Sequence, residues 1–451
     1  MQLVTLWHEY KKTIKLSLPL IVSNLSHVLY GIIDSVMVGS LGVVPLAASA
    51  FINGVIAIPT VFLVGLSSAF SVLVAQSLGR RAYSDCGSYL TNSFWFAQTL
   101  TVVILAGLFF MQPLLNHFGQ APDVVTAGME YYLYMAVSLL FLTATAVFRK
   151  YSEGLSYTLA PTVFYTVGIL LNVFFNWIFI FGHLGAPPMG LAGAGLGTLL
   201  ARGSVAIGLG VYIYWANHFK ETRLGLHLKY LNWQHLKNVA SLAIPSGLQH
   251  LFEVSLFSIS AIFVGWFGAT ALASHQIAIN LATATFMIAL GLSFGTSIRV
   301  GHALGQGRWD QIQHISWSSV IFTGVFMLAV GGLFWGLRFE LPKIYIADPK
   351  VILLSAQLLV VAACFQFFDG AQAVLIGALK GISDIKWPTI LTFLSYWGVG
   401  LPACYVFGVT LGWGSVGVWY GLALSLMASS TLLGIRLKRI LSLQQSKANQ
   451  Y

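Results

Sequence analysis

The chain has 451 residues, of which 57% are hydrophobic and only 8% are charged. Soluble domains carry about a quarter charged residues, so these proportions exclude a soluble globular protein. The mean hydropathy of +0.81 indicates membrane-spanning helices, each of which needs about 20 apolar residues. The net charge is +10, but the basic residues lie in short loops and form no single patch, which argues against nucleic-acid binding.

Charged residues, Gly and Pro divide the apolar sequence into twelve segments. The first follows a basic stretch but has no small-residue cleavage site at its end, so we expect it to be a retained helix. The twelve predicted spans cover residues 16–38, 45–77, 88–112, 127–149, 161–181, 190–215, 240–264, 270–301, 313–337, 351–378, 388–408 and 414–436.

Lys and Arg are distributed unevenly between alternate loops. One set of loops and tails holds 18 of them, including Arg149, Lys150 and Lys380, whereas the other set holds three. By the positive-inside rule the richer set faces the cytoplasm, which places both termini inside and requires an even number of crossings. Twelve spans satisfy that requirement.

The second half of the chain repeats the first. A shift of 226 residues aligns Ser17–Gly79 with Ala243–Gly305 without a gap, and 16 of the 63 pairs are identical. Six spans in each half give both halves the same orientation, which predicts two parallel lobes with a cavity between them and alternating access by rocking. The predicted parts are an N-lobe (1–216), a cytoplasmic linker (217–238), a C-lobe (239–440) and a cytoplasmic tail (441–451).

Three carboxylates, Asp34, Glu253 and Asp369, lie well inside the apolar segments. A carboxylate near the centre of a bilayer costs several kcal/mol and normally marks an ion or proton path. The repeat partner of Asp34 is Ser260, so the architecture itself does not need an acid at that position. The alternative is that such polar residues only join helices through hydrogen bonds.

Other polar residues in the spans permit the same two interpretations. Asn172 and Asn176 lie one turn apart in the fifth span, and Gln276 lies one turn before Asn280 in the eighth. They either line a cavity or join helices. Arg202 is deep in its span and has no obvious partner in sequence, and we expect the side chain of Arg299 to extend from a helix end to the membrane surface.

An ordered set of motifs along the whole chain resembles the multidrug and toxic compound extrusion (MATE) family, and most closely its NorM-type bacterial branch. The motifs are Ser17-Leu-Pro19, Asp34 followed by Val38-Gly39 and Gly42, Gly79, Pro161, Asn172, Asn176, Ile244-Pro245, Phe252-Glu253, His275-Gln276, Ser297-Ile-Arg-Val-Gly301, and Asp369 followed by Gly377, Gly381 and Pro388.

This resemblance implies an all-α membrane protein with V-shaped N- and C-lobes. Glu253 and Asp369 match a Na+ site in the C-lobe, and Asp34 matches a cation-coupling acid of the first helix. Asn176 stands where the archaeal branch has Asp, which favours coupling through the two C-lobe acids. The expected substrate contacts are Asp34, Gln276, Asp369, Asn172, Asn176 and Asp348.

The expected function is export of amphiphilic organic cations, including drugs, in exchange for Na+ or H+. The sequence has no ATP-binding motif, and we expect neither an enzyme nor a bound cofactor. We expect a monomer in the bacterial inner (cytoplasmic) membrane. The alternative is a lipid-linked oligosaccharide flippase of the same superfamily, which should line its cavity with basic residues to bind pyrophosphate.

Overall fold

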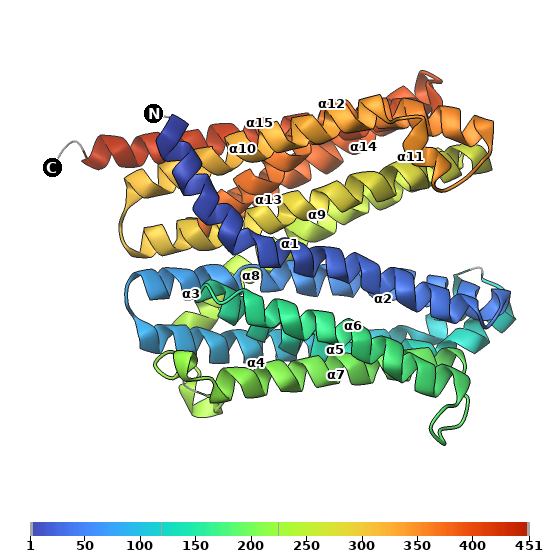
Figure 1. Cartoon of the computed structure of the whole chain (residues 1–451), viewed down its shortest axis with the longest axis horizontal. Coiled ribbons are helices and arrows are strands. Elements are labelled where there is room, and N and C mark those ends of the chain that lie inside the picture. Colours follow the sequence, from blue (N-terminus) through green and yellow to red (C-terminus); the bar gives the residue numbers. More distant parts are fainter. Residues whose placement is uncertain (1–2, 119, 224, 449–451) are drawn as a thin grey trace. The chain divides into compact units, whose positions relative to one another are not determined.

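The structure, a computed structural model, describes residues 3–118, 120–223 and 225–448, and this part of the chain is built from helices and loops without a β-strand (Figure 1). Eleven helical segments in it are long and apolar enough to cross a membrane. Helix α1 (Leu3–Gly39) covers the remaining predicted span, 16–38. All twelve predicted spans therefore coincide with helices.

Contacts divide the chain into two compact units. The N-unit is Val22–Gly247, and the C-unit combines Met1–Ile21 with Leu248–Tyr451. These boundaries lie inside α1 and inside α8 (Trp233–Gly265), whereas the sequence placed the division in the segment 217–238. The apolar pattern marks where a helix crosses the membrane, but it does not show which unit each part of a long helix packs against.

The remaining helices are divided between the two units. In the N-unit they are α2 (Val43–Ser67), α3 (Phe70–Gly79), α4 (Tyr83–Met111), α5 (Pro122–Gly154), α6 (Leu159–Phe181) and α7 (Leu191–Trp215), with short 3-10 helices at Gln112–His117, Asn217–Phe219 and Leu228–Tyr230. In the C-unit they are α9 (Ala269–Gly305), α10 (Trp309–Gly336), α11 (Glu340–Lys343), α12 (Pro349–Gly381), α13 (Lys386–Phe393), α14 (Leu401–Tyr405) and α15 (Gly414–Ala448).

The repeat seen in the sequence is present in these boundaries. The segment Val43–Gly79, which contains α2 and α3, has the same length as α9, which begins 226 residues later. Likewise α5 and α12 each have 33 residues. Each half thus builds its helices to the same pattern.

Helices α5 and α12 extend beyond the predicted spans, which corrects the placement of three basic residues. Arg149, Lys150 and Lys380 lie inside these helices near their C-terminal ends and not in loops. The side chains of Lys150 and Lys380 are only 5% and 4% exposed. The positive-inside pattern indicates the side of the membrane but not whether a basic side chain is solvated.

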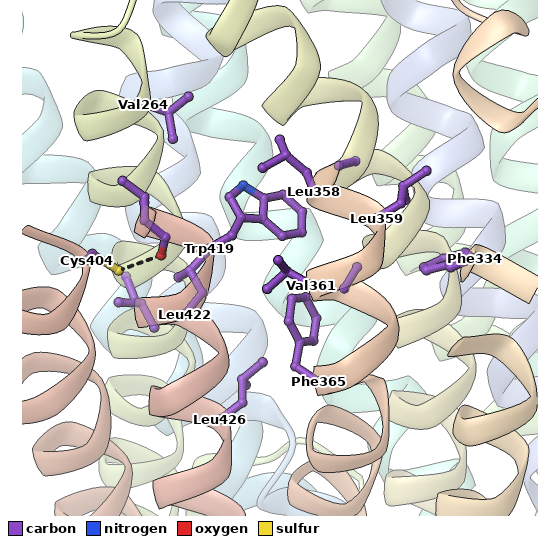
Figure 2. Packing of buried hydrophobic residues seen from close by; sticks show 14 of the residues in the cluster. Val264, Phe334, Leu358, Leu359, Val361, Phe365, Cys404, Trp419, Leu422 and Leu426 are labelled. Atoms are coloured by element: carbon purple, nitrogen blue, oxygen red, sulfur yellow. Dashed lines mark hydrogen bonds between the residues drawn. The ribbon is translucent and has the colours of Figure 1, made fainter. Parts of the chain in front are cut away.

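A hydrophobic core packs α12 against α15 in the C-unit (Figure 2). Trp419 is fully buried there, and its ring stacks on that of Phe365 with a centroid separation of 5.9 Å. The indole Nε1 of Trp419 donates a hydrogen bond to Nδ1 of His275 at 3.0 Å. Because a buried indole N–H needs an acceptor, His275 has a structural role in this core.

The segment between α13 and α15 departs from regular α-helix. Two π-helical stretches, Leu394–Gly400 and Val406–Thr410, flank α14. Pro402 lacks a backbone N–H and cannot complete the α-helical ladder, which accounts for irregular backbone nearby. This irregular segment carries the buried side chain of Tyr396.

Candidate cation and substrate sites

Glu253 on α8 and Asp369 on α12 form an acid pair inside the C-unit. Asp369 is 6% exposed, and the negative charge of Glu253 acts on it electrostatically. The hydroxyl of Tyr396 also lies within the electrostatic range of both acids. Sequence analysis did not identify Tyr396, because the helix that carries it has no regular period from which its face could be inferred.

Three buried glutamines lie about one helical turn from the two acids along α8 and α12. Gln372, one turn after Asp369, donates its Nε2 hydrogen bond to the Tyr396 hydroxyl. Gln366, one turn before Asp369, donates to Oγ1 of Thr285 at 2.9 Å. The third is on α8, four residues before Glu253.

That third residue, Gln249, donates its Nε2 hydrogen bond to Oγ1 of Thr392 at 3.2 Å. All three glutamines thus use their amide nitrogens, and their Oε1 atoms are buried without a partner in the described part of the chain. Leaving a buried acceptor unpaired costs about 1–3 kcal/mol. Carboxylate and amide oxygens are the ligands that hard cations prefer, so this arrangement suits a small cation.

A small cavity adjoins Glu253 between α8, α9 and α12. Its volume is about 20 Å³, measured as the space open to the centre of a water molecule, which is sufficient for one water or small ion. Its polar lining residues are Gln249, His250, Glu253, Ser293, Ser297 and Lys380. Lys380 was not recognised from the sequence as part of any site, although its spacing from Asp369 places it on the same helix face.

Asp34 lies in the N-unit within a chain of side-chain hydrogen bonds. Nδ2 of Asn176 donates to Oδ1 of Asp34 at 2.9 Å and lies 3.3 Å from Oδ1 of Asn172. Nδ2 of Asn172 in turn donates to Oγ1 of Thr198 at 3.2 Å. The structure therefore brings together the three candidate residues that the sequence placed in the first and fifth spans.

Arg202 has a partner that the sequence did not reveal. Its guanidinium donates to Oγ of Ser138 at 2.7 Å and attracts the Asp34 carboxylate electrostatically. Among the residues that the structure describes, Asp34 makes no ion pair within 4.0 Å. The carboxylate is thus balanced at a distance and remains able to accept a further cation.

The other two substrate candidates have local partners. Gln276 is exposed on α9 and donates to Oδ1 of Asn280 at 3.0 Å. Asp348 is the N-cap of α12, where its Oδ1 accepts from the backbone N of Lys350 at 2.8 Å. The structure does not join either residue to the acid pair by a hydrogen bond or ion pair in the part it describes. Their contact with substrate stays a prediction.

The extension of Arg299 to the membrane surface stays a prediction, but the structure gives its guanidinium specific partners. It forms an ion pair with Glu9 and donates to the backbone oxygen of Glu9 at 2.6 Å and to Oγ1 of Thr13 at 2.8 Å. These bonds hold the first part of α1 on α9 within the C-unit. Sequence spacing could not show a contact between residues almost 300 positions apart.

Comparison with known proteins places this architecture in a family. The MatE family model matches residues 19–178 and 245–406. A probable multidrug resistance protein NorM of Idiomarina loihiensis is 32% identical over 439 residues, covering 96% of this chain and 94% of the relative. A protein of the same description from Mesorhizobium japonicum is 33% identical over 437 residues, covering 95% and 93%.

Solved structures share the fold at lower sequence identity. A eukaryotic MATE transporter matches with a TM-score of 0.87 and 18% identity, covering 96% of both chains. The Vibrio cholerae MATE transporter VcmN in its bent form matches with a TM-score of 0.85 and 18% identity, covering 97% of this chain and 98% of that one.

Proposed function

The chain belongs to the MatE family of transporters, and from this premise we propose that it exports amphiphilic organic cations in exchange for Na+. The proposal follows from the chemistry of the acid pair and from the curated relatives, which are described as probable multidrug resistance proteins. It places both termini in the cytoplasm and the protein in the bacterial cytoplasmic membrane, where it acts as a monomer.

The observation that carries the proposal is the acid pair of half-buried Glu253 and buried Asp369. Two carboxylates that repel each other in a low-dielectric interior need a compensating positive charge. The Oε1 atoms of Gln249, Gln366 and Gln372 add neutral ligands of the kind that Na+ prefers. H+ coupling is the second candidate, since a proton also removes the repulsion, but it makes no use of the neutral oxygens.

Exchange follows from competition for negative charge. A bound Na+ neutralises the acids, after which a cationic substrate loses its electrostatic attraction to the site. The two ligands therefore favour different states, and the gradient of Na+ drives the organic cation outward. In this proposal Asp34, Asn172 and Asn176 form the substrate site of the N-unit, and Asp369, Gln276 and Asp348 contact substrate in the C-unit. No observation favours a lipid-linked oligosaccharide flippase.

The test is efflux from proteoliposomes that contain the purified protein and a fluorescent lipophilic cation such as ethidium. We expect an imposed Na+ gradient to drive efflux, and a pH gradient of equal size to drive little. Glu253→Gln and Asp369→Asn should each abolish the response to Na+. A suitable control is Glu340→Gln, because Glu340 is an exposed acid that pairs with Lys343.

The experiment has a clear adverse outcome. If both variants export ethidium under a Na+ gradient as fast as the wild-type protein does, the acid pair is not the coupling site. If only the pH gradient drives efflux and the acid variants lose it, the coupling ion is H+.

A further inference from the structure

Lys380 is a buried cation in the same cavity as Glu253. It lies in the last turn of α12, and it is 4% exposed. Lysine is favoured near the C-terminal end of a helix, but usually as a solvated side chain. Here the side chain of Lys380 lines the cavity beside Glu253, and its ammonium group attracts the Glu253 carboxylate electrostatically.

Glu253 has an electrostatic neighbour of each sign on α12. Asp369 and Lys380 are on the same helix and eleven residues apart, which is close to three full turns and about 16 Å along the axis. Both therefore project from the same face of α12. Glu253 interacts electrostatically with each of them. It has a positive neighbour toward one end of α12 and a negative neighbour toward the other.

The equivalent place in the N-unit has the opposite arrangement. There the repeat partner of Lys380 is Glu153, which is fully buried near the end of α5. Glu153 pairs with Arg149 at 2.5 Å and with Lys150 at 2.7 Å, both on its own helix. Its charge is thus balanced by fixed neighbours within one turn.

In the C-unit the counter-charge of Lys380 comes from a different helix, α8, and a cavity adjoins it. The ammonium group is attached by four methylene groups, so it can change position while the helix stays in place. Glu253, unlike Glu153, therefore has its cationic partner on another helix and beside a cavity.

We propose that the ammonium group of Lys380 is an internal competitor of the coupling cation for Glu253. When the site is empty, Lys380 neutralises Glu253; when Na+ binds between Glu253 and Asp369, the ammonium group of Lys380 moves away from the Glu253 carboxylate. The inference rests on the proposed exchange of Na+ for organic cations and identifies a residue that sets the affinity of that site.

The physical reason is that one carboxylate carries a single negative charge and cannot balance two cations at once. An internal competitor lowers the affinity for Na+ and stabilises the empty site, which otherwise leaves two acids unpaired. Release of Na+ becomes easier for the same reason. Lys380 acts here through its fixed positive charge and needs no change in protonation.

The experiment measures equilibrium binding of 22Na+ to the purified full-length protein. We expect Lys380→Gln to bind 22Na+ roughly tenfold more tightly than the wild type, within the usual range of coupling between two sites. Lys380→Arg keeps the charge and should stay within about twofold of the wild type. A residue with a purely structural role would weaken binding or leave it unchanged.

A double-mutant cycle tests whether Lys380 acts through Glu253. In the Glu253→Gln background, Lys380→Gln should restore part of the thermal stability that Glu253→Gln alone loses by removing the anionic neighbour of Lys380. This stability measurement remains informative if Lys380→Gln folds poorly by itself. Additive effects of the two substitutions on stability would overturn the inference.

The outcomes separate this inference from the proposed function. If the wild-type protein binds no 22Na+ and its efflux ignores Na+, the exchange of Na+ is refuted and the role of Lys380 with it. If the wild type binds and uses Na+ but Lys380→Gln binds it equally or more weakly, only the role of Lys380 is refuted.

Discussion

Asn176 donates a hydrogen bond from its Nδ2 atom to Oδ1 of Asp34 across 2.9 Å, and both side chains are buried. The bond joins α6 to α1 within the N-unit. An amide is a neutral donor, so it fixes the orientation of the carboxylate without cancelling its charge. The Asp34 carboxylate is therefore held in a fixed orientation, and in its ionised form it can attract a cationic ligand.

We predict that Asn176→Ala impairs both stability and transport. The substitution leaves the Asp34 carboxylate without this donor, and a buried acceptor that loses its partner costs about 1–3 kcal/mol. Thermal unfolding in detergent should shift to lower temperature, and ethidium efflux should fall. Asn116→Ala is the matched control, because Asn116 is an exposed asparagine whose side chain donates one hydrogen bond, to the backbone oxygen of Pro113. Equal effects of the two substitutions would contradict a special role for Asn176.

Gly197 provides a second test of the same site. A Cβ atom at Gly197 on α7 would clash with Oδ1 of Asn176. Gly197→Ala must therefore displace the Asn176 side chain, at a cost of about 1–3 kcal/mol for overpacking. We expect lower thermal stability together with a loss of efflux as large as that of Asn176→Ala.

The control for this substitution is Gly107→Ala. Gly107 lies in the interior of α4 and has open space where its Cβ would be. Replacing an unhindered helical glycine by alanine stabilises a protein by about 0.5–1 kcal/mol. If Gly197→Ala is as well tolerated as Gly107→Ala, the close approach of α7 to Asn176 does not matter for the site.

Much of the fold was predictable because long runs of apolar residues identify membrane spans in a sequence. The apolar runs placed all twelve spans, and the repeated Pro and Gly positions predicted two halves of equal design. Asp34, Glu253 and Asp369 stood out for the same reason, since a carboxylate in a long apolar run is conspicuous. What the sequence could not show was how these helices meet side by side.

Tyr396, Lys380 and Arg299 illustrate that limit. Tyr396 lies in a π-helical stretch, where the usual helical period does not assign a face. Lys380 resembles a solvated basic residue at a helix end until burial is known. Arg299 depends on Glu9, which belongs to the other half of the sequence but to the same compact unit.

The bonds of Arg299 lead to a third prediction. Arg299→Met removes the ion pair with Glu9 and the hydrogen bond to Thr13, which is fully buried. Leaving these partners unsatisfied should weaken the attachment of residues 3–21 to the C-unit by roughly 1–3 kcal/mol. Hydrogen exchange followed by mass spectrometry should then show faster exchange in that segment alone.

Lys12 offers the matched control for Arg299. It also pairs with Glu9, at 3.0 Å, but its side chain is half-exposed. Exposed pairs of this kind contribute at most about 1 kcal/mol, and often nothing measurable. Lys12→Met should leave exchange of the segment unchanged. If Arg299→Met also leaves it unchanged, the apolar contacts of Tyr10 and Ile14 suffice to hold the helix.

Asp348 allows a structural role to be separated from contact with substrate. Its carboxylate caps α12 by accepting from the backbone N of Lys350 and Val351 at 2.8 and 3.4 Å. Asparagine caps helices about as well as aspartate, whereas alanine at this position costs about 0.5–2 kcal/mol. Asp348→Asn therefore removes the charge and keeps the cap, whereas Asp348→Ala removes both.

We predict that Asp348→Asn keeps wild-type thermal stability but raises the KM for ethidium efflux about threefold to tenfold, because an attractive charge near the cation is lost. Asp348→Ala should show the same increase in KM together with a lower unfolding temperature. If Asp348→Asn changes neither the thermal stability nor the KM, and Asp348→Ala changes both, the carboxylate serves the helix and not the substrate.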